Sequence, residues 1–194
     1  MDLDDVIAQR VRALRKGRGE TLDELAERSG VSRSMISLIE RRETSPTAAV
    51  LDKLASALGV TLAALFADPP GAAAAQPLAR ASQQQVWTDP ESGYVRRQVS
   101  PTGYPSAVEL VEVIFPPGKS VTFENPMRSV VAHQQVWMLD GELDVTAGDQ
   151  TWQIATGDCL AMELGQHVVF RNRSRRPARY VVALAAAPFP ARRS

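Results

Sequence analysis

The chain has 194 residues, and its 22 Lys and Arg residues balance 22 Asp and Glu residues, so the formal net charge is zero. This length leaves room for one large domain or two small ones. The charge balance excludes a global basic field that would draw the chain onto nucleic acid, so any DNA contact must come from a local patch.

The cysteine content and the N-terminus indicate where the chain acts. A single cysteine excludes an intramolecular disulfide and is typical of a reducing compartment. Residues 1–10, MDLDDVIAQR, are acidic and lack an apolar core, so they do not look like a signal peptide. The chain also lacks an apolar run of about 18 residues, so we expect no membrane span and no membrane partner. We therefore expect a cytoplasmic protein.

Residues 4–16 are predicted to form the first helix, because apolar side chains recur there at helical spacing with basic residues between them. Gly17 and Gly19 should end it.

The stretch 21–46 predicts two short helices joined by a tight turn. Thr21 is a suitable N-cap, and Glu24 three residues later completes a capping box. Gly30 suits the left-handed position that ends a helix, and Ser32 can cap the next helix. The inner face of that second helix carries Met35, Ile36 and Ile39. Such a pair forms either the helix-turn-helix that reads DNA or an ordinary helical hairpin.

Two further helices complete the predicted N-terminal domain. Pro46 breaks the chain, Thr47 caps the next helix, and Gly59 ends it. Its core face carries Val50, Leu51, Leu54, Ala55 and Leu58. Residues 61–66 predict a last short helix, which gives a five-helix domain over residues 1–68.

The composition changes twice after this domain. Residues 69–85, PPGAAAAQPLARASQQQ, consist mainly of proline, alanine and glutamine and predict a linker. From Val86 on, short runs rich in valine and aromatic residues alternate with turn residues, which indicates an antiparallel β sandwich or barrel over residues 86–194. The predicted fold class is therefore multidomain α + β.

Two families share these motifs. The run LAERSGV, the later ISLIER and SPT, and then LDKLASAL resemble the Cro/cI-like (XRE) repressor family over roughly residues 5–67. The segments PPGK at 116–119, LDGEL at 139–143 and GQHVVFRN at 165–172 resemble the cupin family, a double-stranded β-helix or jelly-roll barrel. A helix-turn-helix domain followed by a cupin is similar to a class of bacterial transcriptional regulators.

The repressor resemblance implies how the chain would touch double-stranded DNA. Arg33 would contact a guanine or a phosphate, and Arg41 and Arg42 would hold phosphates. The family usually has a glycine close to Arg42, so the turn there departs from the pattern. The full set of expected DNA-binding residues is Thr21, Ser32, Arg33, Ser34, Ser37, Arg41 and Arg42.

The same resemblance implies an ion pair between Arg15, near the end of the first helix, and Glu40, which closes the recognition helix. The alternative is a pair of solvated surface charges that contributes little to stability.

Metal-binding cupins hold a divalent ion through two histidines and a glutamate of one motif and a histidine of the other. By alignment to those motifs, the four ligand positions are occupied by Arg128, Val130, Gln134 and Val168. None is the expected ligand, so we expect no metal and no cofactor. His133 and His167 lie one residue away, and in a strand such a shift turns the side chain to the opposite face.

A barrel without metal can still bind a small-molecule effector. The expected effector-binding residues combine Arg128 at the rim with inward positions of the motif strands: Arg128, Val130, Gln134, Val136, Met138, Val168 and Phe170. The alternative is that these side chains only fill the barrel. Cys159 is expected to be a buried small hydrophobe rather than a redox sensor.

Three functions remain open. The chain is a sequence-specific regulator whose cupin senses an effector, a DNA-binding protein whose cupin only dimerises, or a metal enzyme similar to the fosfomycin-forming epoxidase family. The epoxidase family needs the iron ligands that this sequence lacks, so we expect no enzyme. We expect the regulator, working as a homodimer through residues 86–189 with Trp137 and Val169 as apolar candidates, and with its DNA-binding domains hanging on the linkers.

Overall fold

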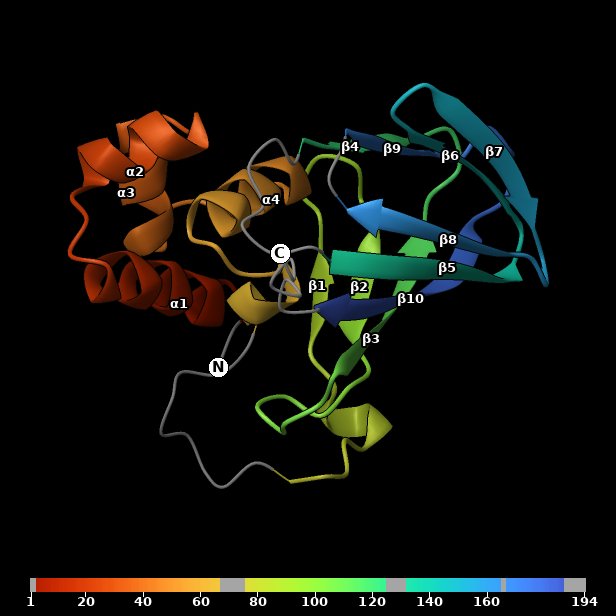
Figure 1. Cartoon of the computed structure of the whole chain (residues 1–194), viewed down its shortest axis with the longest axis horizontal. Coiled ribbons are helices and arrows are strands. Elements are labelled where there is room, and N and C mark those ends of the chain that lie inside the picture. Colours follow the sequence, from red (N-terminus) through yellow and green to blue (C-terminus); the bar gives the residue numbers. More distant parts are fainter. Residues whose placement is uncertain (1–2, 67–75, 125–131, 165–166, 187–194) are drawn as a thin grey trace, which may run out of the picture.

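The computed structural model describes residues 3–66, 76–124, 132–164 and 167–186. Helices form the N-terminal part and antiparallel strands form the rest, in the order that the sequence predicts (Figure 1). The α-helices are α1 (Leu3–Gly17), α2 (Leu22–Ser29), α3 (Arg33–Glu40) and α4 (Ala48–Ala57). The predicted fifth helix is a single 3-10 turn, η1 (Ala63–Phe66), so residues 3–66 contain four α-helices rather than the five expected.

The helix boundaries follow the predicted caps. Thr21 and Glu24 form a complete capping box, in which each side chain accepts a backbone hydrogen bond from the other residue. Ser32 accepts from the backbone N–H of Met35 at the start of α3. Gly30 adopts φ 67°, the left-handed conformation that ends α2. These local signals set where α2 and α3 begin and where α2 ends.

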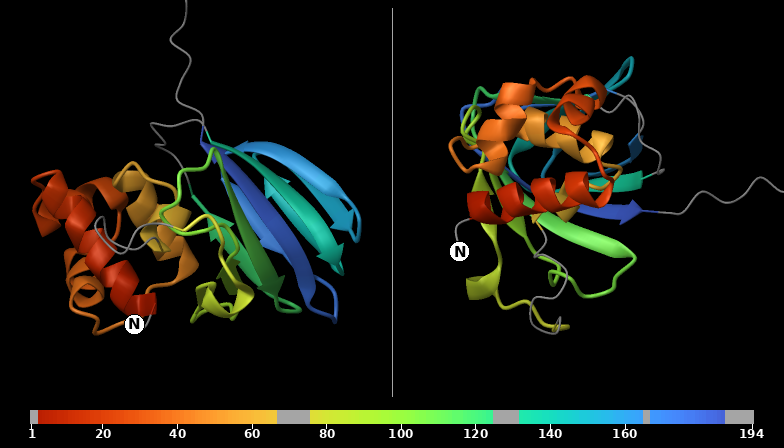
Figure 2. Two further views of the ribbon diagram at one scale, coloured as in Figure 1. Left: turned by 90° about the horizontal axis from the view of Figure 1, so that it is seen from below. Right: turned by 90° about the vertical axis from the view of Figure 1, so that its left-hand side faces the viewer.

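The strands form two antiparallel sheets that face each other (Figures 1 and 2). One sheet has six strands in the order β1-β2-β3-β10-β5-β8, and the other has four in the order β4-β9-β6-β7. The strands are β1 (Val86–Thr88), β2 (Val95–Gln98), β3 (Val108–Phe115), β4 (Ser120–Phe123), β5 (Ala132–Asp140), β6 (Glu142–Ala147), β7 (Gln150–Ala155), β8 (Cys159–Leu164), β9 (Val168–Arg171) and β10 (Ala178–Ala186). This is the cupin-like barrel that the motifs predict.

Gly141 allows the tight turn between β5 and β6. Its φ is 86°, and a Cβ atom at this position would lie 2.8 Å from the carbonyl oxygen of Pro177. Both the backbone conformation and the close approach therefore require glycine, which gives the LDGEL motif a structural reason.

The helices pack directly against one end of the barrel (Figure 2). The Phe66 ring of η1 lies edge-on to Trp87 of β1, with ring centroids 5.7 Å apart. Asp89 beyond β1 accepts a hydrogen bond of 2.8 Å from the backbone N–H of Ala48, in the first turn of α4. The expectation of DNA-binding domains held only by linkers is therefore corrected, because the two parts share a buried core.

The predicted linker lies partly outside the described residues, since nothing is described for 67–75. The described part, 76–85, is mostly exposed and contains one 3-10 turn, η2 (Ala81–Gln83). No described helix is long and apolar enough to cross a membrane.

Candidate functional site

Helix α3 presents a polar face to solvent while its apolar face is buried. Ile36 and Ile39 are almost fully buried in the domain core. Ser32, Arg33 and Ser34 at the N-terminal end are exposed, and Ser37 one turn later is half-buried. The exposed residues thus stand where a recognition helix would meet base edges in the major groove. The hydroxyl of Thr21 already bonds Glu24 in the capping box, although its side chain is exposed.

The three arginines expected at DNA each pair with a nearby carboxylate. Arg33 lies 3.1 Å from Asp23, and both side chains are more than half exposed. Arg41 pairs with Glu43 at 2.8 Å, and Arg42 pairs with Asp5 at 2.9 Å. Exposed pairs of this kind are worth at most about 1 kcal/mol, so a phosphate can displace the carboxylate at little cost.

The departure from the family pattern at Arg42 has a structural counterpart. Arg42 adopts φ 64°, the left-handed region that glycine occupies readily and other residues rarely do. Among the described residues it is the non-glycine residue with positive φ. The chain therefore makes the expected turn with an arginine, whose guanidinium is directed to Asp5 on α1.

The predicted pair between Arg15 and Glu40 is confirmed, and it is largely buried. Two parallel hydrogen bonds join the guanidinium to the carboxylate, from Nε to Oε1 at 2.6 Å and from Nη2 to Oε2 at 2.7 Å. The side chains are 11% and 8% exposed. Arg15 also donates to the backbone carbonyl of Glu20 at 2.7 Å. The hydrogen bond to Glu40 raises the pKa of Arg15, so the pair fixes the end of α3 onto α1 as two full charges.

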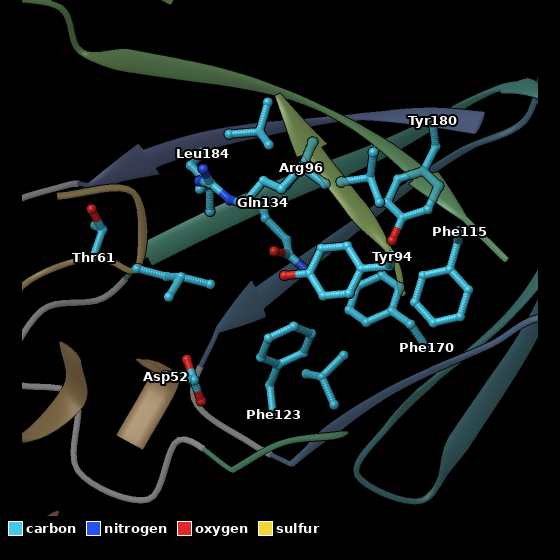
Figure 3. Close-up of a pocket in the computed structure, with 15 residues that line it drawn as sticks. Asp52, Thr61, Tyr94, Arg96, Phe115, Phe123, Gln134, Phe170, Tyr180 and Leu184 are labelled. Carbon is cyan, nitrogen blue, oxygen red and sulfur yellow. The ribbon is translucent and has the colours of Figure 1, made fainter. Parts of the chain in front are cut away.

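A cavity of about 90 Å³ lies inside the barrel at the end that faces the helices (Figure 3). Three of the predicted effector residues line it, namely Gln134, Val168 and Phe170. Val136 and Met138 are buried as predicted but do not line the cavity. Arg128 and Val130 lie outside the described residues.

Sequence reasoning missed most of the cavity wall. The additional lining residues are Asp52, Thr61 and Leu62 from the helical side, and Tyr94, Arg96, Val111, Val113, Phe115, Phe123, Tyr180, Val182 and Leu184 from the strands. Strand alternation places Tyr94, just before β2, on the same face as Arg96 and Gln98, but the sequence does not indicate that this face is the inner one. The contribution of the helices carries no sequence signal.

Among the described residues that line the cavity, Arg96 is the cation, and it is 5% exposed. Its guanidinium carbon lies 4.6 Å from the centre of the Phe66 ring, and Nη1 donates to Oε1 of Gln98 at 3.3 Å. Burial lowers the pKa of Arg96, and burial raises the pKa of Tyr94 beside it. Arginine nevertheless stays protonated in proteins, so the cavity holds a permanent positive charge.

The histidines and the cysteine lie away from this cavity. His133 and His167 are exposed, as the one-residue shift from the ligand positions predicts. Within the described ranges, His, Cys, Asp and Glu side chains do not gather in a group of three that could hold a metal ion. Cys159 is exposed rather than buried, which corrects the expectation, because β8 is the outer strand of its sheet and the residue points outward.

Comparison with known proteins gives consistent matches. Residues 11–65 match the helix-turn-helix family HTH_3. The chain is 32% identical over 163 residues to the HTH-type transcriptional regulator SutR of Escherichia coli (strain K12), which covers 84% of each chain. It is 41% identical over 62 residues to SinR of Bacillus subtilis (strain 168), over 31% of this chain and 56% of that regulator.

The fold extends over the full length of a solved relative. The crystal structure of an HTH_3 family transcriptional regulator from Vibrio cholerae superposes with a TM-score of 0.75 at 24% identity. The match covers 96% of this chain and 98% of that chain. Helices and barrel are therefore shared together, which confirms the predicted fold class.

The buried ion pair generates a stability prediction. Replacement of Glu40 by alanine strands the Arg15 charge, so we expect Glu40→Ala to lower the free energy of unfolding by about 3–5 kcal/mol. Chemical denaturation of the full chain, followed by the helical circular dichroism signal, measures this. Glu43→Ala is the matched control, because it removes an exposed carboxylate and should cost less than about 1 kcal/mol. Equal losses in the two variants would show that the Arg15–Glu40 pair contributes no more than a surface pair.

Proposed function

The chain belongs to the helix-turn-helix family of transcriptional regulators, and from that premise we propose that its barrel senses a small-molecule effector and dimerises the chain. Residues 1–68 would read operator DNA, residues 69–85 would connect the two parts, and residues 86–194 would hold the effector. The protein would act in the cytoplasm on double-stranded DNA.

The single observation that carries sequence-specific reading is the presentation of α3. Its buried face is fixed by the core and by the Arg15–Glu40 pair, so the exposed side chains have a defined orientation. Arg33 is the long donor near the N-terminal end of this face and can reach guanine O6 and N7. Ser32, Ser34 and Ser37 would make shorter contacts to bases or phosphates, and Thr21 would contact the backbone from the start of α2.

We propose a regulator rather than an enzyme. At two of the ligand positions of metal-binding cupins the chain has Gln134 and Val168, which are poor ligands for iron or zinc. The relative that is matched over 84% of its length is named a transcriptional regulator. The cavity favours effector sensing over a barrel that only dimerises, because a domain that only dimerises does not need an internal cavity.

Dimerisation would use the outer face of the six-stranded sheet. Large apolar side chains are exposed there at outward positions of β1, β3 and β5: Val86, Val108, Leu110, Ile114 and Trp137. Trp137 is 52% exposed, and a group of such residues is typical of a protein interface. Val169 lies on β9 of the four-stranded sheet, so it cannot share this face with Trp137, and we remove it from the proposed interface.

The first test concerns base reading. We expect Arg33→Ala to weaken binding to an operator selected from random DNA by about 1–3 kcal/mol and to weaken binding to random DNA much less. Fluorescence anisotropy at fixed salt gives both affinities. Arg173→Ala serves as the control, because it removes an exposed arginine on the barrel and should change neither affinity. Equal losses on operator and random DNA would make Arg33 a phosphate contact.

The second test concerns the dimer. Trp137→Glu places a charge in the proposed interface, so we expect the full chain to sediment as a monomer while its circular dichroism is unchanged. Gln153→Glu adds the same charge to β7 on the other sheet and should leave the dimer intact. A Trp137→Glu variant that still sediments as a dimer would contradict this interface.

A further inference from the structure

Arg96 is a buried arginine that faces the cavity. Among the described residues, no Asp or Glu oxygen forms an ion pair with it, and its Nη1 donates a hydrogen bond to the neutral side-chain amide of Gln98. Its neighbour Arg97 points to the other face of β2, where it pairs with Glu112. Of these two arginines on one strand, Arg97 therefore has a carboxylate partner, whereas Arg96 faces the cavity.

A buried arginine in this situation needs compensation. The guanidinium has five N–H donors and cannot lose its charge, whereas one hydrogen bond and one aromatic contact account for only part of its capacity. Glu109 on β3 lies close enough to influence Arg96 electrostatically, but it makes no ion pair with it among the described residues. An anion in the cavity would supply the missing acceptor with charge-assisted hydrogen bonds.

The other residues that line the cavity indicate the size and polarity of the ligand. Phe123, Val168, Phe170 and Leu184 are apolar, and Gln134 is the neutral polar group beside Arg96 (Figure 3). A cavity of about 150 Å³ lined by apolar side chains accepts benzene. The cavity here, about 90 Å³, suits a smaller molecule with an apolar body of a few carbon atoms.

We propose that the cavity binds a short-chain organic carboxylate, with the carboxylate on the guanidinium of Arg96 and the apolar chain against the aromatic wall. The inference deepens the proposed effector function and rests on it. Thr61 and Leu62, which follow α4, also line the cavity, and Arg96 stacks on Phe66 of η1. The carboxylate is therefore held between the barrel and the DNA-reading helices, where its presence changes the surroundings of both.

The test compares straight-chain carboxylates of about three to six carbons with the primary amides of the same length, by calorimetric titration into the full-length wild-type chain. The two series have nearly the same shape, so only the charge differs. We expect at least one carboxylate to bind about tenfold or more tightly than its amide. If no carboxylate binds, or if amides bind as well as carboxylates, the proposal is wrong.

Variants then assign the charge to Arg96. Arg96→Gln should weaken the best carboxylate about tenfold or more and leave its amide unchanged. Arg97→Gln is the matched control on the same strand, and it should leave both affinities unchanged, since Arg97 faces away from the cavity. Equal carboxylate binding by Arg96→Gln and wild type would overturn the assignment. Should Arg96→Gln fail to fold, Arg96→Lys, which keeps the charge and loses the planar fork, should still prefer carboxylate to amide.

Operator binding in the absence of any carboxylate separates this inference from the proposed function. A chain that binds operator selectively but discriminates no carboxylate from its amide contradicts only the ligand class. A chain that binds carboxylate through Arg96 but shows no operator preference contradicts the DNA-binding proposal and leaves the anion site standing.

Discussion

The contact between Phe66 and Trp87 joins the two parts of the molecule, and the rest of the architecture depends on it. From Trp87 a column of rings continues to Tyr94 at 5.7 Å and on to Phe115 at 5.9 Å, deep in the barrel. Each such aromatic pair contributes about 0.5–1.5 kcal/mol beyond its area of burial. Together with the Asp89 cap on α4, the column makes the helical domain one wall of the barrel interior.

This arrangement connects the cavity to the recognition helix through contiguous contacts. Arg96 lies over Phe66 of η1, and the carbonyl of Ala64 in the same turn accepts a hydrogen bond of 3.1 Å from Arg10 on α1. Five residues after Arg10 on the same helix, Arg15 forms the ion pair with Glu40 at the end of α3. An effector in the cavity can influence DNA binding only if it favours one arrangement of these contacts over another. The contacts from Arg96 through η1 and α1 to α3 would carry such a change from the cavity to the recognition helix.

The features that could be predicted from the sequence are those that neighbouring residues determine. The capping box at Thr21, the glycine at position 30 and the alternation of β5 set the helix-turn-helix and the strand faces, and the structure agrees with each. The predictions that went wrong depend on tertiary placement. Within the segment 61–66 only Ala63–Phe66 forms a 3-10 turn, which places Phe66 against Trp87, and the docking of the helices onto the barrel has no local signal. Arg96 was missed because an arginine in a strand usually faces solvent, whereas here the helices cover it.

The DNA-reading helices and the barrel should move as one body, and the rotational diffusion of the full chain tests this most directly. Nuclear magnetic resonance relaxation of backbone amides gives a separate correlation time for the residues of α1–α4 and for the residues of the two sheets. Docking through Phe66, Trp87 and Asp89 predicts the same correlation time for both sets. A distinctly shorter correlation time for the helices would show that they tumble on a flexible tether, and would contradict this account.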